Sequence, residues 1–312
     1  MDYTHLLDEE TWAYINTVGT YYPDDAVNRS VAEQRQVYET LCQAFRPPFP
    51  DGIETEDLSA AGVPARVYSA GRPTRTVMFF HGGGWVVGSL ETHDDVCAEL
   101  CAQTGYRVVS VDYRLAPEHK HPAAFDDCWV ATQWAFETYG DPLVLVGDSA
   151  GGNLAAAVAQ HARGRLEDVL GQILIYPALG GEMDKPSYIE HAHAPLLTME
   201  DMIYYSTVRH DGVPPEDDPT SEPLRDTDFS GLPPTYLITA DCDPLRDDSC
   251  DYADRIRSAG GNVHWRNEEG LVHGYIRARH TVAKARDSFE CISIAIEALG
   301  QGIWPYEEDD VE

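Results

Sequence analysis

The chain has 312 residues, 43% of them hydrophobic, which is enough for one large core with a modest accessory element and too few for two full catalytic domains. Its formal net charge of -31 at pH 7 repels nucleic acid and anionic membrane surfaces, so we expect neither as a partner. We find no secretion signal and no apolar run long enough to span a bilayer, and therefore expect a cytoplasmic protein.

The seven cysteines form no CxxC pair, and an odd count without an export signal indicates reduced thiols. Cys97 and Cys101 are four residues apart, which places both on one face of a helix, and we expect them to be packing residues. The acidic composition favours two hypotheses equally. One is adaptation to a saline habitat, where salt screens the repulsion between like charges, and the other is an ordinary acidic cytosolic protein. The acidic run at residues 307–312 is expected to fray.

The first elements expected along the chain are helices, and apolar residues at helical spacing mark one of them over residues 31–45. A proline- and glycine-rich segment at 46–52 then breaks this pattern. Strands are predicted next, at residues 76–80, 107–111, 143–146, 172–176, 235–240 and 263–266.

These predicted strands are unbroken apolar runs, which are typical of strands buried on both faces of a parallel sheet. Helical stretches between them, such as residues 154–162 and 252–259, predict right-handed βαβ crossovers. The sequence therefore predicts an α/β fold with a mostly parallel central sheet flanked by helices.

Residues 183–224 interrupt the alternation with many prolines and acids. Within them, Thr198 caps a predicted helix over 199–209, with Asp201 at the capping-box position. An insertion between strands on the active-site side of a sheet is typical of a lid. We predict a small helical cap of residues 1–45 and 183–224 over a core of residues 46–182 and 225–312.

The strongest local motif is Gly-Asp-Ser-Ala-Gly at residues 147–151, between a predicted strand and an alanine-rich helix. G-x-S-x-G in that context is the nucleophile elbow of α/β-hydrolases. Side chains at the flanking glycines would clash with neighbouring backbone in so sharp a turn. We predict Ser149 as the nucleophile and the Ala150 amide, at a helix N-terminus, as an oxyanion donor.

A second motif, His81-Gly82-Gly83-Gly84-Trp85, directly follows the strand predicted at 76–80. It matches an HGGG-type oxyanion loop, in which the amides of Gly83 and Gly84 donate and His81 is structural. A phosphate-binding glycine loop is the alternative, but the lysine and Ser/Thr of that motif do not follow.

The acid and base of a serine hydrolase of this type come later, in the order acid and then histidine. Asp243 and His273 each follow a predicted strand at the sheet edge where Ser149 emerges. His273 would accept the serine proton, and Asp243 would orient His273. Asp241 stays an alternative acid, and the nearby Asp247 and Asp248 rank lower.

Three aromatic residues are candidates for lining a substrate pocket: Trp85 beside the oxyanion loop, and Tyr204 and Tyr205 on the predicted cap helix. Packing is the alternative role for each of them. The histidine pairs at 119/121 and 191/193 lack further ligands with matching spacing, so we expect no metal site.

Five motifs extend in order over most of the chain: His81-Gly82-Gly83-Gly84-Trp85, Asp112-Tyr113-Arg114-Leu115-Ala116-Pro117-Glu118, Gly147-Asp148-Ser149-Ala150-Gly151-Gly152-Asn153, Asp243-Pro244-Leu245 and His273-Gly274-Tyr275. Together they resemble the hormone-sensitive-lipase-like esterases, the bacterial family IV of lipolytic enzymes. The resemblance implies the α/β-hydrolase fold, no cofactor, and an acid that precedes Pro-Leu, which favours Asp243 over Asp241. The residues it assigns are the triad Ser149, Asp243 and His273, and the oxyanion donors Gly83, Gly84 and Ala150.

Residues 31–36 and 88–94 look like the acetyl-esterase branch of that family, which implies a small-molecule ester with a short acyl chain as substrate. An amidase or arylformamidase would use the same triad and stays open. A non-catalytic receptor is a third alternative, since the plant gibberellin receptors resemble this family but lack the histidine that His273 supplies here. The sequence leaves the oligomeric state open, a homodimer included.

Overall fold

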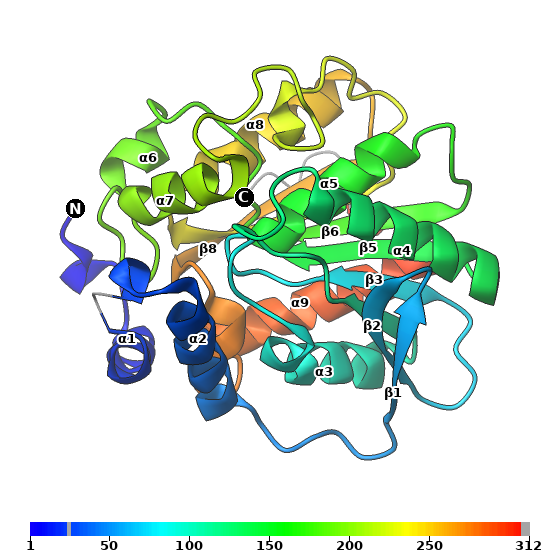
Figure 1. Cartoon of the computed structure of the whole chain (residues 1–312), viewed down its shortest axis with the longest axis horizontal. Coiled ribbons are helices and arrows are strands. Elements are labelled where there is room, and N and C mark those ends of the chain that lie inside the picture. Colours follow the sequence, from blue (N-terminus) through cyan, green and yellow to red (C-terminus); the bar gives the residue numbers. More distant parts are fainter. Residues whose placement is uncertain (24–25, 307–312) are drawn as a thin grey trace.

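The centre of the fold is an eight-stranded sheet with the strand order β1-β2-β4-β3-β5-β6-β7-β8 (Figure 1). The structure is a computed structural model that describes residues 1–23 and 26–306, so the acidic run at 307–312 lies outside the described residues. From β4 to β8 every neighbouring pair is parallel, whereas β1 and β2 join the edge antiparallel. The strands are β1 (Glu54–Ala60), β2 (Val63–Ser69), β3 (Thr76–Phe80), β4 (Arg107–Val111), β5 (Leu143–Asp148), β6 (Val169–Ile175), β7 (Thr235–Cys242) and β8 (Val263–Val272).

All six predicted strands are present, and β3 and β4 have the predicted bounds. The hairpin of β1 and β2 was not predicted. Most of β1 is exposed, with only Ala60 fully buried, so it lacks the apolar run that marks the other strands. The tight turn between the two strands places Ala61 and Gly62 at positive φ (51° and 101°), as two-residue hairpin loops require.

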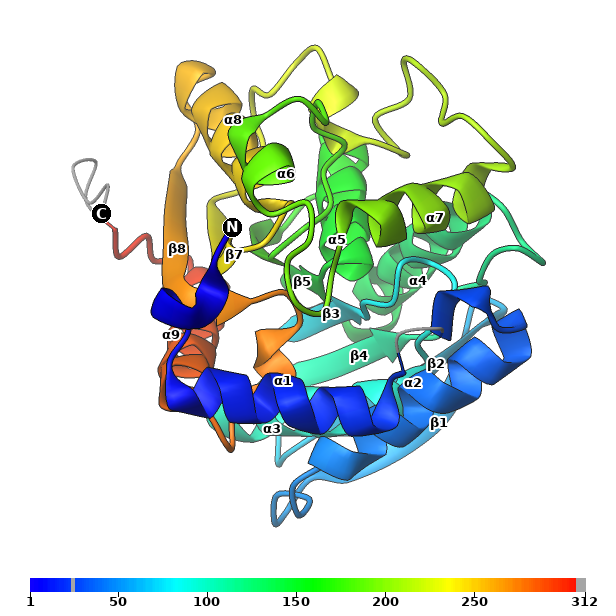
Figure 2. The ribbon, with the colours of Figure 1, turned by 90° about the vertical axis from the view of Figure 1, so that its left-hand side faces the viewer.

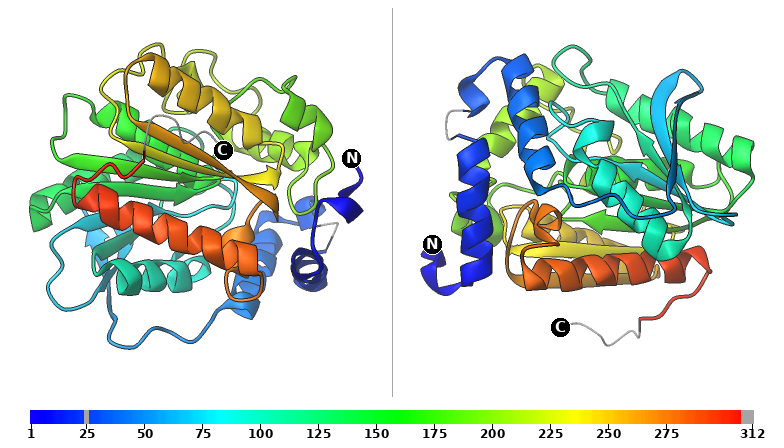
Figure 3. Two further views of the ribbon diagram at one scale, coloured as in Figure 1. Left: turned by 180° about the vertical axis from the view of Figure 1, so that it is seen from behind. Right: turned by 90° about the horizontal axis from the view of Figure 1, so that it is seen from below.

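Helices cover both faces of the sheet (Figure 3). α3 and α9 lie on one face, and α4, α5 and α8 lie on the other. The helices are α1 (Glu9–Tyr21), α2 (Val31–Phe45), α3 (Asp94–Thr104), α4 (Ala123–Tyr139), α5 (Ala150–Ala162), α6 (Pro186–Glu190), α7 (Met199–His210), α8 (Arg246–Ser258) and α9 (Ala283–Gly300).

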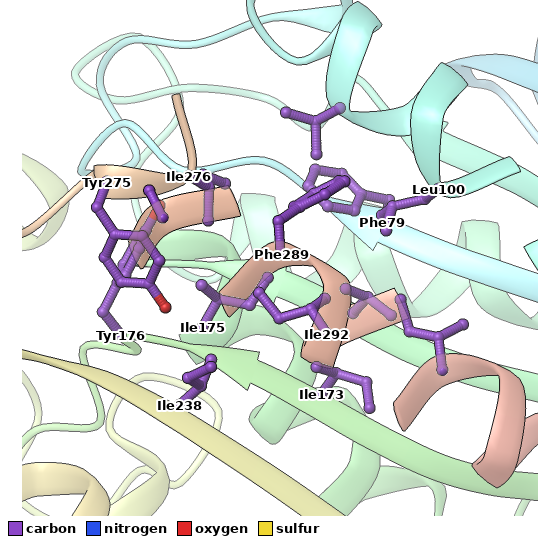
Figure 4. Close-up of a cluster of buried hydrophobic side chains, with 14 of the residues drawn as sticks. Phe79, Leu100, Ile173, Ile175, Tyr176, Ile238, Tyr275, Ile276, Phe289 and Ile292 are labelled. Atoms are coloured by element: carbon purple, nitrogen blue, oxygen red, sulfur yellow. The ribbon is translucent and has the colours of Figure 1, made fainter. Parts of the chain in front are cut away.

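Two hydrophobic cores result, one on each side of the sheet. Successive residues of β3 alternate between them, so that Phe79 faces α3 and α9 while Phe80 faces α4 and α5. Figure 4 shows the first core, where Phe79 and Ile173 from the sheet pack with Phe289 from α9. Burying each such side chain contributes about 1.5–3 kcal/mol, and burial on both faces explains why the strands read as unbroken apolar runs.

Four helices, α1, α2, α6 and α7, gather at the carboxyl ends of the parallel strands (Figure 2). Two hydrogen bonds join the N-terminal pair to α7: the hydroxyls of Tyr22 and Tyr205 lie 3.4 Å apart, and Gln34 Nε2 donates to the Tyr204 hydroxyl at 2.8 Å. α7 begins with the predicted capping box of Thr198, whereas α6 was not predicted. Segments far apart in the chain thus cover one end of the sheet together.

The seven cysteines are free thiols, and Cys97 and Cys101 on α3 have no exposed surface, which agrees with the predicted packing role. In the described part of the chain, no helix combines the length and hydropathy needed to cross a membrane.

Negative charge is concentrated on the surface of the protein. The chain has 53 acidic residues against 22 lysines and arginines. The buried acids among the described residues are Asp94, Asp95, Glu99, Asp127, Asp148, Asp243, Asp248 and Glu268. The other described carboxylates reach solvent, where their mutual repulsion opposes the folded state.

If the chain is adapted to salt, its free energy of unfolding should rise as NaCl is added. The Debye length falls from about 10 Å at 0.1 M salt to 3 Å at 1 M, which screens repulsion between surface carboxylates. Urea unfolding at constant pH between 0.05 and 2 M NaCl measures this change. A free energy that stays flat or falls contradicts saline adaptation, and equal concentrations of a neutral osmolyte provide the control.

Candidate active site

Ser149 lies on a strained turn between β5 and α5, with φ 56° and ψ -118°. The flanking glycines are required by contact distances. A Cβ on Gly147 would lie 2.2 Å from the Gly151 carbonyl oxygen, and a Cβ on Gly151 would lie 1.8 Å from the Phe80 carbonyl oxygen in β3. Any other residue at either position would displace backbone, so the two glycines permit the turn that exposes the serine hydroxyl.

The structure brings Ser149, His273 and Asp243 together, each at the carboxyl end of a different strand. Ser149 Oγ lies 2.8 Å from His273 Nε2, and His273 Nδ1 lies 2.6 Å from Asp243 Oδ2. Because an ionised carboxylate can only accept a hydrogen bond, Nδ1 carries the proton that Asp243 accepts. Nε2 is then the ring nitrogen that is free to accept the serine proton. Asp243 has no exposed surface, and its second oxygen accepts the Leu245 amide at 2.9 Å.

The other candidate acids have different partners. Asp241 accepts a hydrogen bond from Asn267 at 3.0 Å, and Asp247 accepts the Ser187 amide at 2.9 Å. Asp248 accepts from the Tyr188 hydroxyl at 2.8 Å. Asp243 is therefore the carboxylate that lies against His273.

Residues that the sequence reading did not single out hold the histidine loop in place. Tyr14 on α1 donates its hydroxyl to the carbonyl of Gly274, the residue after His273, at 3.0 Å. The Tyr176 ring packs against the imidazole with centroids 4.6 Å apart. The N-terminal helix thus contacts the loop that carries His273.

The glycine loop after β3 lies beside the nucleophile turn. Gly83 and Gly84 both have positive φ, 127° and 59°. Within the described residues, the amides of Gly83, Gly84 and Ala150 donate to no other protein group. Ala150 is the first residue of α5, so its amide has no partner inside the helix. These three amides remain available for an oxyanion.

The second residue of the nucleophile motif, Asp148, connects the glycine loop to the serine turn. Its Oδ1 accepts the Gly82 amide at 2.8 Å, and His93 Nε2 lies 3.3 Å away. Burial opposes ionisation of Asp148, but His93 and the Gly82 amide hold its pKa below the ordinary value. This role of Asp148 was not predicted, although a carboxylate at the last buried position of a strand indicates a specific partner.

His81 has the structural role expected of it. It is fully buried, its ring stacks on Tyr113 with centroids 4.2 Å apart, and the Tyr113 hydroxyl donates to its carbonyl at 2.6 Å. Burial lowers the pKa of His81 to about 4, so the ring is neutral at pH 7.

A pocket of about 90 Å³ opens at Ser149, between the glycine loop and the helices above it. Trp85 and Tyr205 line it, and the Tyr205 ring packs so closely on Gly84 that a Cβ there would come within 2.4 Å of it. Tyr204 is not among the lining residues, because its hydroxyl is directed to Gln34 on α2. Arg209, which the sequence did not mark, also lines the pocket.

One histidine of each pair considered as metal ligands has another partner. His121 Nε2 lies 2.9 Å from Asp218, and His191 Nδ1 lies 3.2 Å from the Tyr3 hydroxyl. Over residues 1–23 and 26–306, no cluster of three His, Cys, Asp or Glu side chains is arranged to hold a metal ion.

Comparison with known proteins agrees with this geometry. A family described as having the alpha/beta hydrolase fold matches residues 77–277. The carboxylesterase NlhH of Mycobacterium tuberculosis is 41% identical over 226 residues, which cover 68% of this chain and 70% of that protein. An ethyl acetate hydrolase of Pseudomonas putida is 29% identical over 324 residues, 95% of this chain and 99% of that one.

Among solved structures, an esterase from the bacterial hormone-sensitive lipase family has a TM-score of 0.86 and 26% identity, covering 94% of this chain and 98% of its own. The matched segment contains the glycine loop, the serine turn and the loops of Asp243 and His273. The chain therefore belongs to the family with the α/β-hydrolase fold, and within it to the carboxylesterases of the hormone-sensitive-lipase group, which are serine hydrolases.

Proposed function

We propose that this carboxylesterase uses Ser149 as nucleophile, His273 as general base and acid, and Asp243 as the group that orients His273. The observation that carries the proposal is the unbroken chain of hydrogen bonds from Ser149 to His273 at 2.8 Å and from His273 to Asp243 at 2.6 Å. These lengths lie within the range needed for proton transfer between positioned groups.

In the proposed mechanism, Ser149 Oγ attacks the ester carbonyl while His273 Nε2 takes its proton. The carbonyl oxygen becomes an oxyanion, and the amides of Gly83, Gly84 and Ala150 stabilise it. His273 then protonates the departing alcohol, leaving an acyl group on Ser149. Water, activated by the same nitrogen, hydrolyses that acyl-enzyme and restores the serine. Every step uses side chains and amides of the chain itself, so the proposal includes no cofactor.

We further propose that residues 1–45 and 183–224 act as a cap and limit the substrate to short acyl esters, acetyl to butyryl. The pocket at Ser149 has a volume of about 90 Å³, whereas pockets for drug-sized ligands have roughly 300–1,000 Å³. Tyr205 of the cap restricts it by packing on Gly84. The similarity to an ethyl acetate hydrolase over nearly the whole chain also supports an ester with a short acyl chain as the substrate.

Two alternatives have different support. An amide substrate would use the same three side chains, and the site geometry does not separate it from an ester. A binding role without turnover would leave the hydrogen-bonded histidine without a purpose, since binding alone does not need a base aligned with a serine.

Replacement of the nucleophile tests the proposed chemistry. Ser149→Ala should lower kcat on p-nitrophenyl acetate by about 10⁴-fold or more, as expected when one member of a triad is removed. The control is Ser230→Ala, because Ser230 is an exposed serine in a loop outside the pocket. Circular dichroism would verify that both variants fold, and retention of a tenth of the activity in Ser149→Ala would refute the assignment.

The size limit predicts a maximum in kcat/KM at acyl chains of two to four carbons. A series of p-nitrophenyl esters from acetate to laurate measures it, because longer chains exceed the small pocket beneath Tyr205. A best substrate with eight or more carbons would show that the cap does not act as proposed. Adding p-nitroacetanilide compares an acetyl amide with the matched acetyl ester, and faster amide cleavage would favour the amidase.

A further inference from the structure

A buried arginine lines the pocket without a carboxylate partner. Arg209, in the last turn of α7, is only 3% exposed. Its guanidinium donates to the Ser221 carbonyl at 3.1 Å and to Asn153 Oδ1 at 3.3 Å, and lies 3.9 Å above the Trp85 ring. No carboxylate of the described residues lies within ion-pair distance of it. A buried charge is costly unless it is paired, and neutral acceptors compensate it only in part.

The position of Arg209 relative to the nucleophile follows from its contact with Asn153. Asn153 lies four positions after Ser149, the N-cap of α5, hence about one turn further and about 6 Å along the helix axis. Arg209 and Ser149 line one pocket. A substrate seated at Ser149 therefore shares this pocket with the guanidinium.

Trp85 provides a second unused donor in the same pocket. The residue is 8% exposed, and its buried indole nitrogen has no hydrogen-bond partner in the described part of the chain. A buried N–H without an acceptor is uncommon in folded proteins. Two residues that line the pocket thus carry donors that are not fully satisfied in the described part of the chain. The Arg209 guanidinium contacts only neutral acceptors, and the Trp85 indole nitrogen has none.

The acidic residues lining the pocket are already engaged. Glu222 pairs with Arg225 at 3.1 Å, and Asp248 accepts the Tyr188 hydroxyl and two backbone amides. Burial raises the pKa of Asp248 to about 7, so much of it is neutral at that pH. His210 adds no charge, since burial lowers its pKa to about 4. Burial lowers the pKa of Arg209 to about 9 against the attraction of Glu222, so the guanidinium keeps its charge at pH 7.5. Arg209 is the pocket cation that has no carboxylate in direct contact in the described part of the chain.

We propose that the pocket binds small esters that carry a carboxylate two or three carbons from the scissile carbonyl, with Arg209 as the residue that recognises it. This proposal rests on the ester hydrolysis proposed above and names its substrate class. A carboxylate accepts two hydrogen bonds from a guanidinium fork and neutralises its charge. The substrate carboxylate would lie either on the acyl side of the ester, as in a half-ester of a short dicarboxylic acid, or on the alcohol side, as in an acetylated hydroxy acid.

Two matched substrate pairs distinguish a carboxylate on the acyl side from one on the alcohol side. On the acyl side, monoethyl succinate is compared with ethyl butyrate, in which a methyl group replaces the carboxylate. On the alcohol side, O-acetylglycolate is compared with ethyl acetate, which differs in the same way. Hydrolysis is followed by pH-stat at pH 7.5 in 0.5 M NaCl, so that the net charge of -31 is screened. The readout is the kcat/KM of the acidic ester divided by that of its neutral partner.

In at least one pair, the wild-type ratio should be one or higher, and Arg209→Gln should lower that ratio tenfold or more. Hydrogen bonds to charged groups contribute about 1.5–3 kcal/mol, which corresponds to roughly 10- to 150-fold. Arg209→Lys, which keeps the charge but not the fork, should lower the ratio less. The control Arg286→Gln removes the same charge from an exposed side chain of α9, 66% accessible, and should leave the ratio unchanged.

A role of Arg209 in holding the cap alone would lower kcat/KM for acidic and neutral esters together, and an unchanged ratio would overturn the proposal. A wild-type ratio below one-tenth in both pairs would overturn it without any variant, should Arg209→Gln not fold. Ser149→Ala distinguishes a failure of the proposed ester hydrolysis from a failure of the carboxylate recognition. Hydrolysis that survives it refutes the proposed function, whereas Ser149-dependent hydrolysis with an unaltered ratio refutes only the carboxylate recognition.

Discussion

The start of α5 approaches the end of β3 so closely that only glycine fits between them. Gly151 has no room for a Cβ, because the Phe80 carbonyl oxygen would lie 1.8 Å away. β3 continues into the glycine loop, and β5 continues into the turn of Ser149. This single backbone contact therefore sets the distance between Ser149 and the glycine loop. Electrostatic stabilisation of an oxyanion depends on such fixed spacing, since the donors must be in place before charge develops.

A buried carboxylate reinforces this spacing. Asp148, on the serine turn, accepts the Gly82 amide of the glycine loop, and His93 from the start of α3 lies beside it. Charge-assisted hydrogen bonds of this kind are stronger than neutral ones. The loop is thus held from two directions, by backbone packing at Gly151 and by the Asp148 hydrogen bond. Its own amides at Gly83 and Gly84 are consequently left for a ligand.

The sheet and the neighbourhood of Ser149, Asp243 and His273 could be predicted from the sequence because each has a local pattern. Strands buried on both faces are unbroken apolar runs, and parallel topology brings their carboxyl ends to one edge, where Asp243 and His273 follow β7 and β8. β1 lacks such a pattern because most of it faces solvent. The roles of Tyr14 and Arg209 could not be predicted, since each arises from a contact between segments distant in sequence. Nor could the direction of Tyr204, because adjacent residues on a helix differ by about 100° in direction and only packing decides which one faces the pocket.

The sheet and the helices contribute different parts of the site, which explains how relatives can share chemistry and differ in substrate. The groups proposed to react come from loops after β3, β5, β7 and β8, whose positions the sheet determines. The pocket walls come largely from segments such as α7, which contributes Tyr205 and Arg209. Discrimination between two esters is a difference in binding free energy at those walls, and a charged wall residue changes it more than an apolar one.

A surface that carries a charge of -31 disfavours anions at long range, so an anionic substrate would need a buried cation at short range. The buried position of Arg209 meets that requirement, because low local dielectric strengthens its interaction with a carboxylate while the surface charges are screened by salt.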